Sequence, residues 1–328
     1  MLFKERLGRI AMRAVTGMAA AGALAALASC GGGTYQQQAF VPARLLVFGD
    51  ESSRLEGPQG LKYSINGISA TTGAVDCTVS PIWTQALATS YGLTFANCNP
   101  NASFETNAID NTTLNGTVAD VVQNVAAFTA GDTFNGNDLV TIWVGMHDIL
   151  NDYEANATGD ESVLLADMKE QGATLAGVVN QIANAGAKVI ILTVPDMSNS
   201  PFSYVEEQRG DFDRAQLLSD MSTQFNVGLR SNIINDGSKI GLVLVDDLVR
   251  NAVRSPGSFG LIANDNQTYG CLDSAPLPTC SSLTLRPDPA TGQAAQSAFM
   301  WADATRLGSV MQAQIGSQAV GRAHSNPF

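Results

Sequence analysis

Short apolar runs alternate with amphipathic segments over most of the chain. Four of the runs are almost entirely apolar and end at turn residues, a pattern typical of strands that are buried on both faces of a parallel sheet. The predicted strands are Arg44–Phe48, Asp138–Val144, Lys188–Val194 and Gly241–Val245. The sequence therefore predicts a sheet whose strands lie in the interior of one folded domain.

The segments between these runs repeat apolar residues at helical spacing. Helices are predicted near residues 118–128 and 164–182, from about Phe212 to Ile234, and from Gln293 to about Ile315, whereas Ser255–Pro289 is expected to be a long loop. Strands that alternate with helices predict an α/β fold, a three-layer αβα sandwich with a mainly parallel, doubly wound sheet. In such sheets functional residues gather at the carboxyl ends of the strands.

The first forty residues have a different pattern. Four basic residues precede an uncharged apolar run that ends at Leu27-Ala28-Ser29-Cys30. This order resembles a bacterial lipoprotein signal, in which the cysteine becomes the lipidated first residue, although an ordinary signal peptide with an incidental cysteine is the alternative. We expect a signal peptide over residues 1–29, a flexible tether over 30–42, a single domain over 43–318 and a C-terminal tail over 319–328.

The net charge narrows the possible partners. The 328 residues carry a formal charge of −12, and removal of the signal leaves 18 − 4 = 14 basic and 30 − 1 = 29 acidic residues, or −15. So acidic a body is not expected to bind nucleic acid, and anionic lipid surfaces would repel it. A lipid on Cys30 would then attach it to the bacterial cell envelope, with the outer membrane as the expected location.

Cysteine usage is consistent with export. Besides Cys30 the chain has Cys77, Cys98, Cys271 and Cys280, an even number that suggests two disulfides. Three pairings are possible, and proximity in sequence favours Cys77–Cys98 and Cys271–Cys280. None of the pairs has the close spacing of zinc ligands, and the sequence predicts no cofactor.

The predicted strand ends resemble, in order, the sequence blocks of the GDSL/SGNH hydrolases. The segments that carry the resemblance are Leu46–Asp50, Trp83–Leu93, Val144–Asp148, Leu192–Asp196 and Trp301–Arg306. The resemblance covers about residues 43–318 and implies a flavodoxin-like sheet. It also implies a catalytic Ser, an Asn that donates to the oxyanion, and an Asp–His pair near the C-terminus.

At the catalytic positions the chain departs from the family. Glu51 stands at the position of the nucleophilic Ser, His147 at that of the Asn and Arg306 at that of the His, so only Asp303 is retained. The second-block Gly, expected within residues 106–113, has no clear counterpart. Arg306 cannot act as a base because it stays protonated, and the remaining histidine, His324, is expected to be mobile near the C-terminus.

These substitutions favour a non-catalytic protein, but three alternatives remain open. Ser52 could attack with His147 as its base, Glu51 could act as a nucleophile or general base, or carboxylates and imidazole could bind a metal. A non-catalytic cleft could still bind acyl chains or glycans, or the protein could have a structural role. The paired replacement of the family's Ser and His by Glu51 and Arg306 predicts that these two side chains lie within ~4 Å of each other, with His147 and Asp303 alongside. The alternative is that Arg306 points to solvent and Glu51 has no partner.

Overall fold

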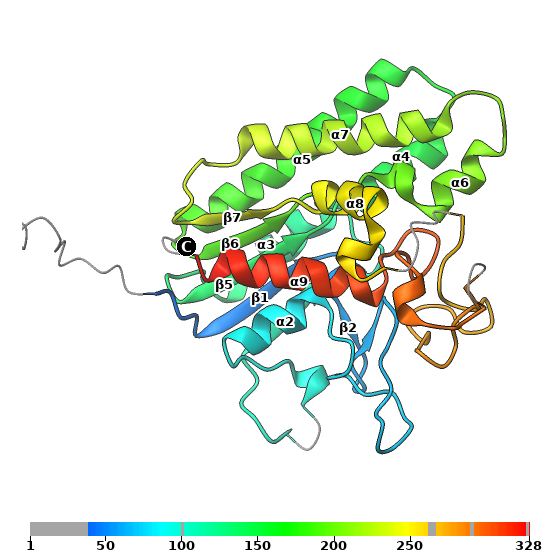
Figure 1. Ribbon diagram of the computed structural model, residues 1–328. Coiled ribbons are helices and arrows are strands. Elements are labelled where there is room, and N and C mark those ends of the chain that lie inside the picture. Colours follow the sequence, from blue (N-terminus) through cyan, green and yellow to red (C-terminus); the bar gives the residue numbers. More distant parts are fainter. Residues whose placement is uncertain (1–38, 100–101, 262–266, 289–291, 326–327) are drawn as a thin grey trace, which may run out of the picture. The chain divides into compact units, whose positions relative to one another are not determined.

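The computed structural model describes residues 39–99, 102–261, 267–288, 292–325 and 328. Five strands form one parallel sheet in the order β4-β1-β5-β6-β7 (Figure 1). They are β1 Arg44–Gly49, β4 Ala108–Thr112, β5 Asp138–Trp143, β6 Lys188–Leu192 and β7 Ile240–Val243. The mainly parallel α/β fold predicted from the sequence is confirmed.

The strands contribute side chains to two separate apolar cores, one on each face of the sheet. In β1, Leu46 and Phe48 enter one core, whereas Leu45 and Val47 enter the other. All four are fully buried. This two-sided burial explains why β1 is a nearly unbroken apolar run instead of alternating between apolar and polar residues.

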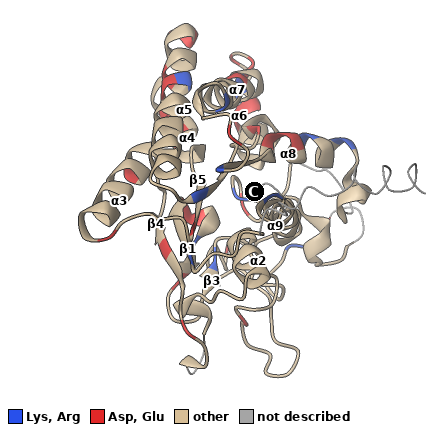
Figure 2. Cartoon of the chain, turned by 90° about the vertical axis from the view of Figure 1, so that its left-hand side faces the viewer, with Lys and Arg blue, Asp and Glu red and all other residues tan. Residues whose placement is uncertain are grey.

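Helices cover both faces of the sheet. They are α2 Trp83–Ser90, α3 Val118–Gly131, α4 Met146–Asn156, α5 Glu161–Asn184, α6 Pro201–Glu207, α7 Arg214–Asn232, α8 Val245–Arg254 and α9 Ser309–Ala323. Helices α3, α5 and α7 pack in the core that contains Phe48, and α2, α8 and α9 pack in the core that contains Val47. In the view of Figure 2 these two groups lie on opposite sides of β1 and β5. The chain therefore has the predicted three layers.

Short elements complete the fold. They are the antiparallel pair β2 Leu55–Glu56 and β3 Leu61–Lys62, and the 3₁₀ helices η1 Glu51–Ser53, η2 Ala96–Cys98, η4 Met197–Asn199, η5 Pro256–Phe259 and η6 Gln296–Ala298. Of these, η1 follows β1 directly and carries the residue at the family's serine position.

The last helix differs from its prediction. It was expected over about 293–315, but α9 begins at Ser309 and continues to Ala323. The segment before it is held in a tight turn, because Asp303 Oδ1 accepts hydrogen bonds from the backbone N–H groups of Thr305 (2.9 Å) and Arg306 (2.7 Å). Such local side-chain bonds compete with helix formation.

The described residues that follow α9, His324 and Phe328, pack against the folded body. The His324 ring stacks on Tyr91 with 4.3 Å between centroids, and Phe328 is buried with its ring 5.5 Å from that of Phe40. The expectation of a mobile His324 is therefore wrong.

Both predicted disulfides are present. Cys77–Cys98 and Cys271–Cys280 each have a Cα–Cα distance of 5.6 Å. Lys62 secures the first of these loops from inside, since its fully buried ammonium donates to the carbonyl oxygens of Cys77 (3.1 Å), Val79 (2.7 Å) and Ser80 (3.0 Å). Burial lowers the pKa of Lys62 to about 8.

The predicted signal peptide, the lipidation site Cys30 and the tether up to residue 38 lie outside the described residues. Among the helices of the described chain, none is long and apolar enough to cross a membrane.

Candidate functional site

The site lies where β1 and β5 end beside the turn at 301–307. Gly49 closes β1 with φ +129°, and a Cβ there would lie 2.0 Å from the Trp143 carbonyl oxygen at the end of β5. A glycine is therefore required for the two strand ends to lie this close. The backbone then turns into η1, and Glu51 is placed at the carboxyl edge of the sheet.

Glu51 is fully buried, and both of its carboxylate oxygens are occupied. Oε1 accepts from Arg306 Nε at 2.6 Å and contacts His147 Nε2 at 2.8 Å, and Arg306 Nη2 forms a further ion pair with the same oxygen. Oε2 accepts from the Asn115 backbone N–H at 2.8 Å. The predicted contact between Glu51 and Arg306 is confirmed, with His147 directly beside it.

Arg306 joins the remaining members of the cluster. Its Nη1 donates to Asp303 Oδ2 at 2.8 Å, and its Nη2 donates to the Asn115 side-chain oxygen at 3.3 Å. Asp303 thus lies alongside as predicted and binds the residue at the family's histidine position. Because the guanidinium does not release a proton at physiological pH, this contact is electrostatic and cannot relay a proton.

Burial and the neighbouring charges together set the pKa values of Glu51, His147 and Asp50. Burial alone would raise the pKa of Glu51, but the hydrogen bond from His147 and the charge of Arg306 lower it to about 2. Burial opposes the charged form of His147, yet Glu51 outweighs this effect and raises its pKa. Burial, helped by the charge of Glu51, raises the pKa of Asp50 to about 7. Near neutral pH, Glu51 is therefore ionised and paired with the cationic Arg306.

Asp50 and Ser52 have local structural roles. Asp50 Oδ1 accepts from the Ser52 backbone N–H at 2.8 Å and so caps η1. Ser52 is buried, and its carbonyl oxygen accepts from Gln312 Nε2 of α9 at 3.4 Å. Among the hydrogen bonds of the described residues, none joins the Ser52 hydroxyl to His147. The serine–base pair of the alternative mechanism is thus not assembled.

Sequence reasoning missed the segment after β4. The second-block glycine was sought within 106–113, but Asn115 and Gly116 lie against the end of β1. A Cβ on Gly116 would be 3.1 Å from the Gly49 carbonyl oxygen, and Asn115 supplies the backbone donor to Glu51. The Asn115-Gly116 dipeptide, a frequent turn signal, could have marked this position. Asp110, which stands inside the expected range, accepts instead from the Leu55 backbone N–H at 3.1 Å.

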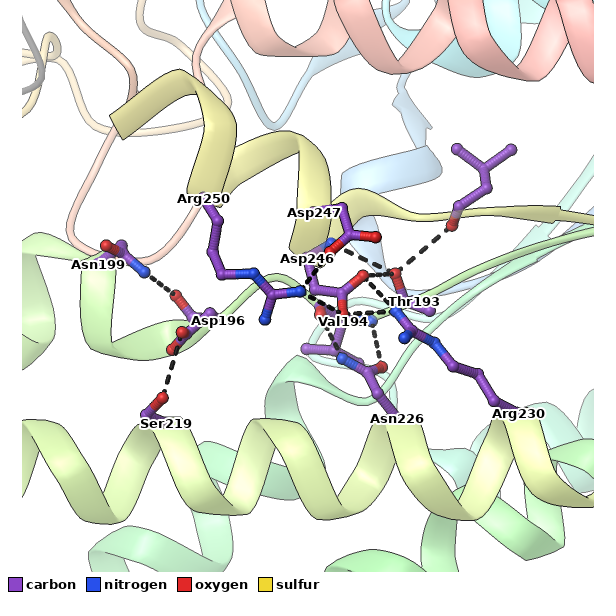
Figure 3. A network of polar contacts seen from close by, with 11 residues as sticks. Thr193, Val194, Asp196, Asn199, Ser219, Asn226, Arg230, Asp246, Asp247 and Arg250 are labelled. Carbon is purple, nitrogen blue, oxygen red and sulfur yellow. Dashed lines mark hydrogen bonds and ion pairs between the residues drawn. The ribbon is translucent and has the colours of Figure 1, made fainter. Parts of the chain in front are cut away.

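The neighbouring strand ends, at β6 and β7, are closed by a polar network (Figure 3). Asp246 accepts from the Thr193 hydroxyl at 2.7 Å and from Arg230 of α7. Asn226 bonds both the N–H and the carbonyl of Val194, each at 2.9 Å. These contacts fasten α7 and α8 to the sheet beside the site.

A metal site is not formed here. No group of three or more His, Cys, Asp or Glu side chains in the described part of the chain is arranged to hold a metal ion. Asp50, Glu51, His147 and Asp303 are the carboxylates and the imidazole that could have bound a metal, and they do not form such a group. Arg306 lies between Glu51 and Asp303 and supplies the positive charge itself.

No family model matches the chain. A phosphatidylcholine-sterol acyltransferase from Aeromonas hydrophila is 27% identical over 195 residues, which are 58% of this chain and 54% of that protein, so the match spans about half the length of the relative.

Two solved structures are also similar. A member of the lipolytic G-D-S-L family from Veillonella parvula is 11% identical with a TM-score of 0.40, covering 85% of this chain and 96% of its own. An acetyl xylan esterase is 10% identical with a TM-score of 0.42, covering 84% and 96%. In the order of its sequence blocks and in the parallel sheet that carries them, the chain resembles the GDSL/SGNH hydrolases.

Proposed function

We propose that this protein is a non-catalytic envelope lipoprotein that keeps the GDSL/SGNH fold as a binding or structural scaffold. In this proposal Cys30 carries the lipid, the membrane is reached through that anchor, and the acidic body lies on the periplasmic or surface side. An acyl chain or a glycan is the proposed class of ligand.

The state of Glu51 is the single observation that supports the loss of catalysis. A carboxylate nucleophile must be free to attack, and a carboxylate that acts as general base must have a pKa near the working pH. Glu51 is fully buried, and its two oxygens are engaged by Arg306, His147 and the Asn115 N–H. With its pKa lowered to about 2, the carboxylate is also a weak base at neutral pH.

The second candidate is an atypical ester hydrolase that uses Ser52 or Glu51. Two observations favour it. Ser52 is adjacent to the family's serine position on η1, and the curated relative is named as an acyltransferase. Such an enzyme would need η1 to rearrange, because the Asp50 cap fixes the Ser52 backbone.

Ester hydrolysis separates the two candidates. We expect the mature protein to hydrolyse short-chain and long-chain nitrophenyl esters at the rate of buffer alone. Turnover that Ser52→Ala or Glu51→Ala abolishes, while an exposed-site variant such as Glu56→Ala keeps it, would establish the hydrolase instead. Recovery of activity is expected to require Glu51→Ser, His147→Asn and Arg306→His together, since members of a triad act as a unit.

A further inference from the structure

The donors around Glu51 surround a complete carboxylate. Arg306 contributes Nε and Nη2, His147 contributes Nε2 and Asn115 contributes its backbone N–H, so both oxygens are bound. The bound carboxylate is fully buried, whereas the side chains of Arg306 and His147 are 17% and 10% exposed. The cluster is therefore close to solvent although its centre is enclosed.

Each donor is also held by groups other than Glu51. Arg306 is fixed by Asp303 at 2.8 Å, and Asp303 is fixed by the backbone of its own turn. Asn115 lies in a turn in which the Thr113 N–H donates to the Gly49 carbonyl at 2.9 Å and the Gly116 N–H to that of Thr113 at 3.1 Å.

His147 is the remaining donor, and it lies in the first turn of α4 behind Gly145. A Cβ on that glycine would lie 2.4 Å from the Phe225 ring and 2.6 Å from Val194, so α4 is packed closely here. Because none of these supports involves Glu51, the donors are preorganised without its carboxylate.

We propose that this cluster is a binding site for small monocarboxylates and that its occupant in the folded chain is the chain's own Glu51. The part of Glu51 beyond Cβ is CH₂–COO⁻, which differs from acetate by one hydrogen. Replacement of Glu51 by alanine therefore opens a cavity with the size and donors that acetate requires. This inference does not depend on the proposed function, because it concerns binding and not turnover.

The donor set selects a planar monoanion. Charged donors favour an ionised acceptor, and the guanidinium with a flanking N–H fits two coplanar oxygens. A neutral amide of the same shape would turn an N–H₂ group toward cationic donors, so acetamide should not bind. Chloride has the charge but cannot engage both sets of donors, and it serves as the ionic-strength control.

The first experiment measures the melting temperature of the mature Glu51→Ala protein during titration with sodium acetate, sodium chloride or acetamide at pH 7. We expect acetate alone to raise it, saturably and by about 5 °C near a hundredfold excess over Kd. The wild type should not respond, because its site is filled. Glu56→Ala, which removes a surface carboxylate paired with Arg54, should not respond either.

The second experiment tests the donors. In Glu51→Ala/Arg306→Met, acetate affinity should fall at least about tenfold, because the charged fork is lost. If Glu51→Ala does not stay folded, its refolding yield in acetate is compared with that in chloride, and a higher yield in acetate supports the site. Equal responses to acetate and chloride, equal refolding yields, or an acetate effect that survives Arg306→Met would overturn the proposal.

Discussion

The strongest energetic prediction concerns the ion pair between Glu51 and Arg306. Arg306→Met keeps much of the apolar stem but removes the charge, and Glu51→Gln keeps the shape but removes the carboxylate. Each single substitution leaves one buried ionic group with fewer partners, whereas the double variant removes both charges. The double variant should therefore be less destabilised than the sum of the single variants.

The contacts of Glu51 set the size of the expected loss in folding stability. Removing one partner of a buried ion pair costs about 3–5 kcal/mol. The lower end applies here, because after Arg306→Met the carboxylate still binds His147 at 2.8 Å and the Asn115 N–H at 2.8 Å. We expect about 3 kcal/mol for each single variant and a coupling energy of about 2 kcal/mol, the size of one charge-assisted hydrogen bond.

Urea unfolding of the mature, disulfide-intact protein at pH 7 provides the assay, with fluorescence and circular dichroism as independent probes. A matched cycle on Arg54 and Glu56, a half-exposed pair joined at 2.7 Å, provides the control and should give about 0–1 kcal/mol. The reasoning fails if the two cycles give the same coupling, or if the costs at Glu51 and Arg306 are additive.

Three further predictions concern pH, cysteines and location. The pKa of Asp50 is raised from 3.8 to about 7, so this group binds more protons when folded and stability should fall as the pH rises from about 4 through 7; Asp50→Asn should flatten this decline in urea midpoints. The raised pKa of His147 adds a decline that begins only above its ordinary value of 6.5. The stability that Glu51 contributes is present above 4.5 and should be lost only as the pH falls toward about 2. Peptide mapping should find the disulfides Cys77–Cys98 and Cys271–Cys280, each of which should stabilise the fold by about 2–4 kcal/mol. Free thiols or crossed pairs would contradict this prediction. Cys30→Ser should release the protein from the detergent phase, whereas a wild type that is already soluble would contradict lipidation.

Strands β1, β5, β6 and β7 could be predicted from the sequence, but β4, at one edge of the sheet, could not. Strands buried on both faces form unbroken apolar runs, which identified β1, β5, β6 and β7. Strand β4 lies at the edge beside β1, includes Asp110 and Asn111, and leaves Ile109 40% exposed. Its sequence has no apolar run because only part of it is buried. The start of α9 was misplaced because Asp303 stabilises a turn that apolar periodicity does not reveal.

In the site, the side-chain partners could be predicted and the backbone partner could not. Glu51, His147, Asp303 and Arg306 were identified because each occupies a block position whose family residue has a known neighbour. The Asn115 contact is made by a backbone N–H, which any residue except proline can supply. Only the turn geometry, with Asn115 at φ +55° before Gly116, brings that donor to the site.

The contact between Glu51 and Arg306 is a permanent ion pair and not a proton-transfer contact. General acid–base catalysis requires a group whose pKa lies near the working pH. Here the pKa of Glu51 is lowered to about 2, and Arg306 stays protonated, so the pair cannot exchange a proton near neutrality. The wide gap between the pKa values of Glu51 and Arg306 also stabilises the ion pair, because both groups stay charged over the whole physiological pH range. The contact between Glu51 and Arg306 therefore fastens the end of β1 to the 301–307 turn in this protein.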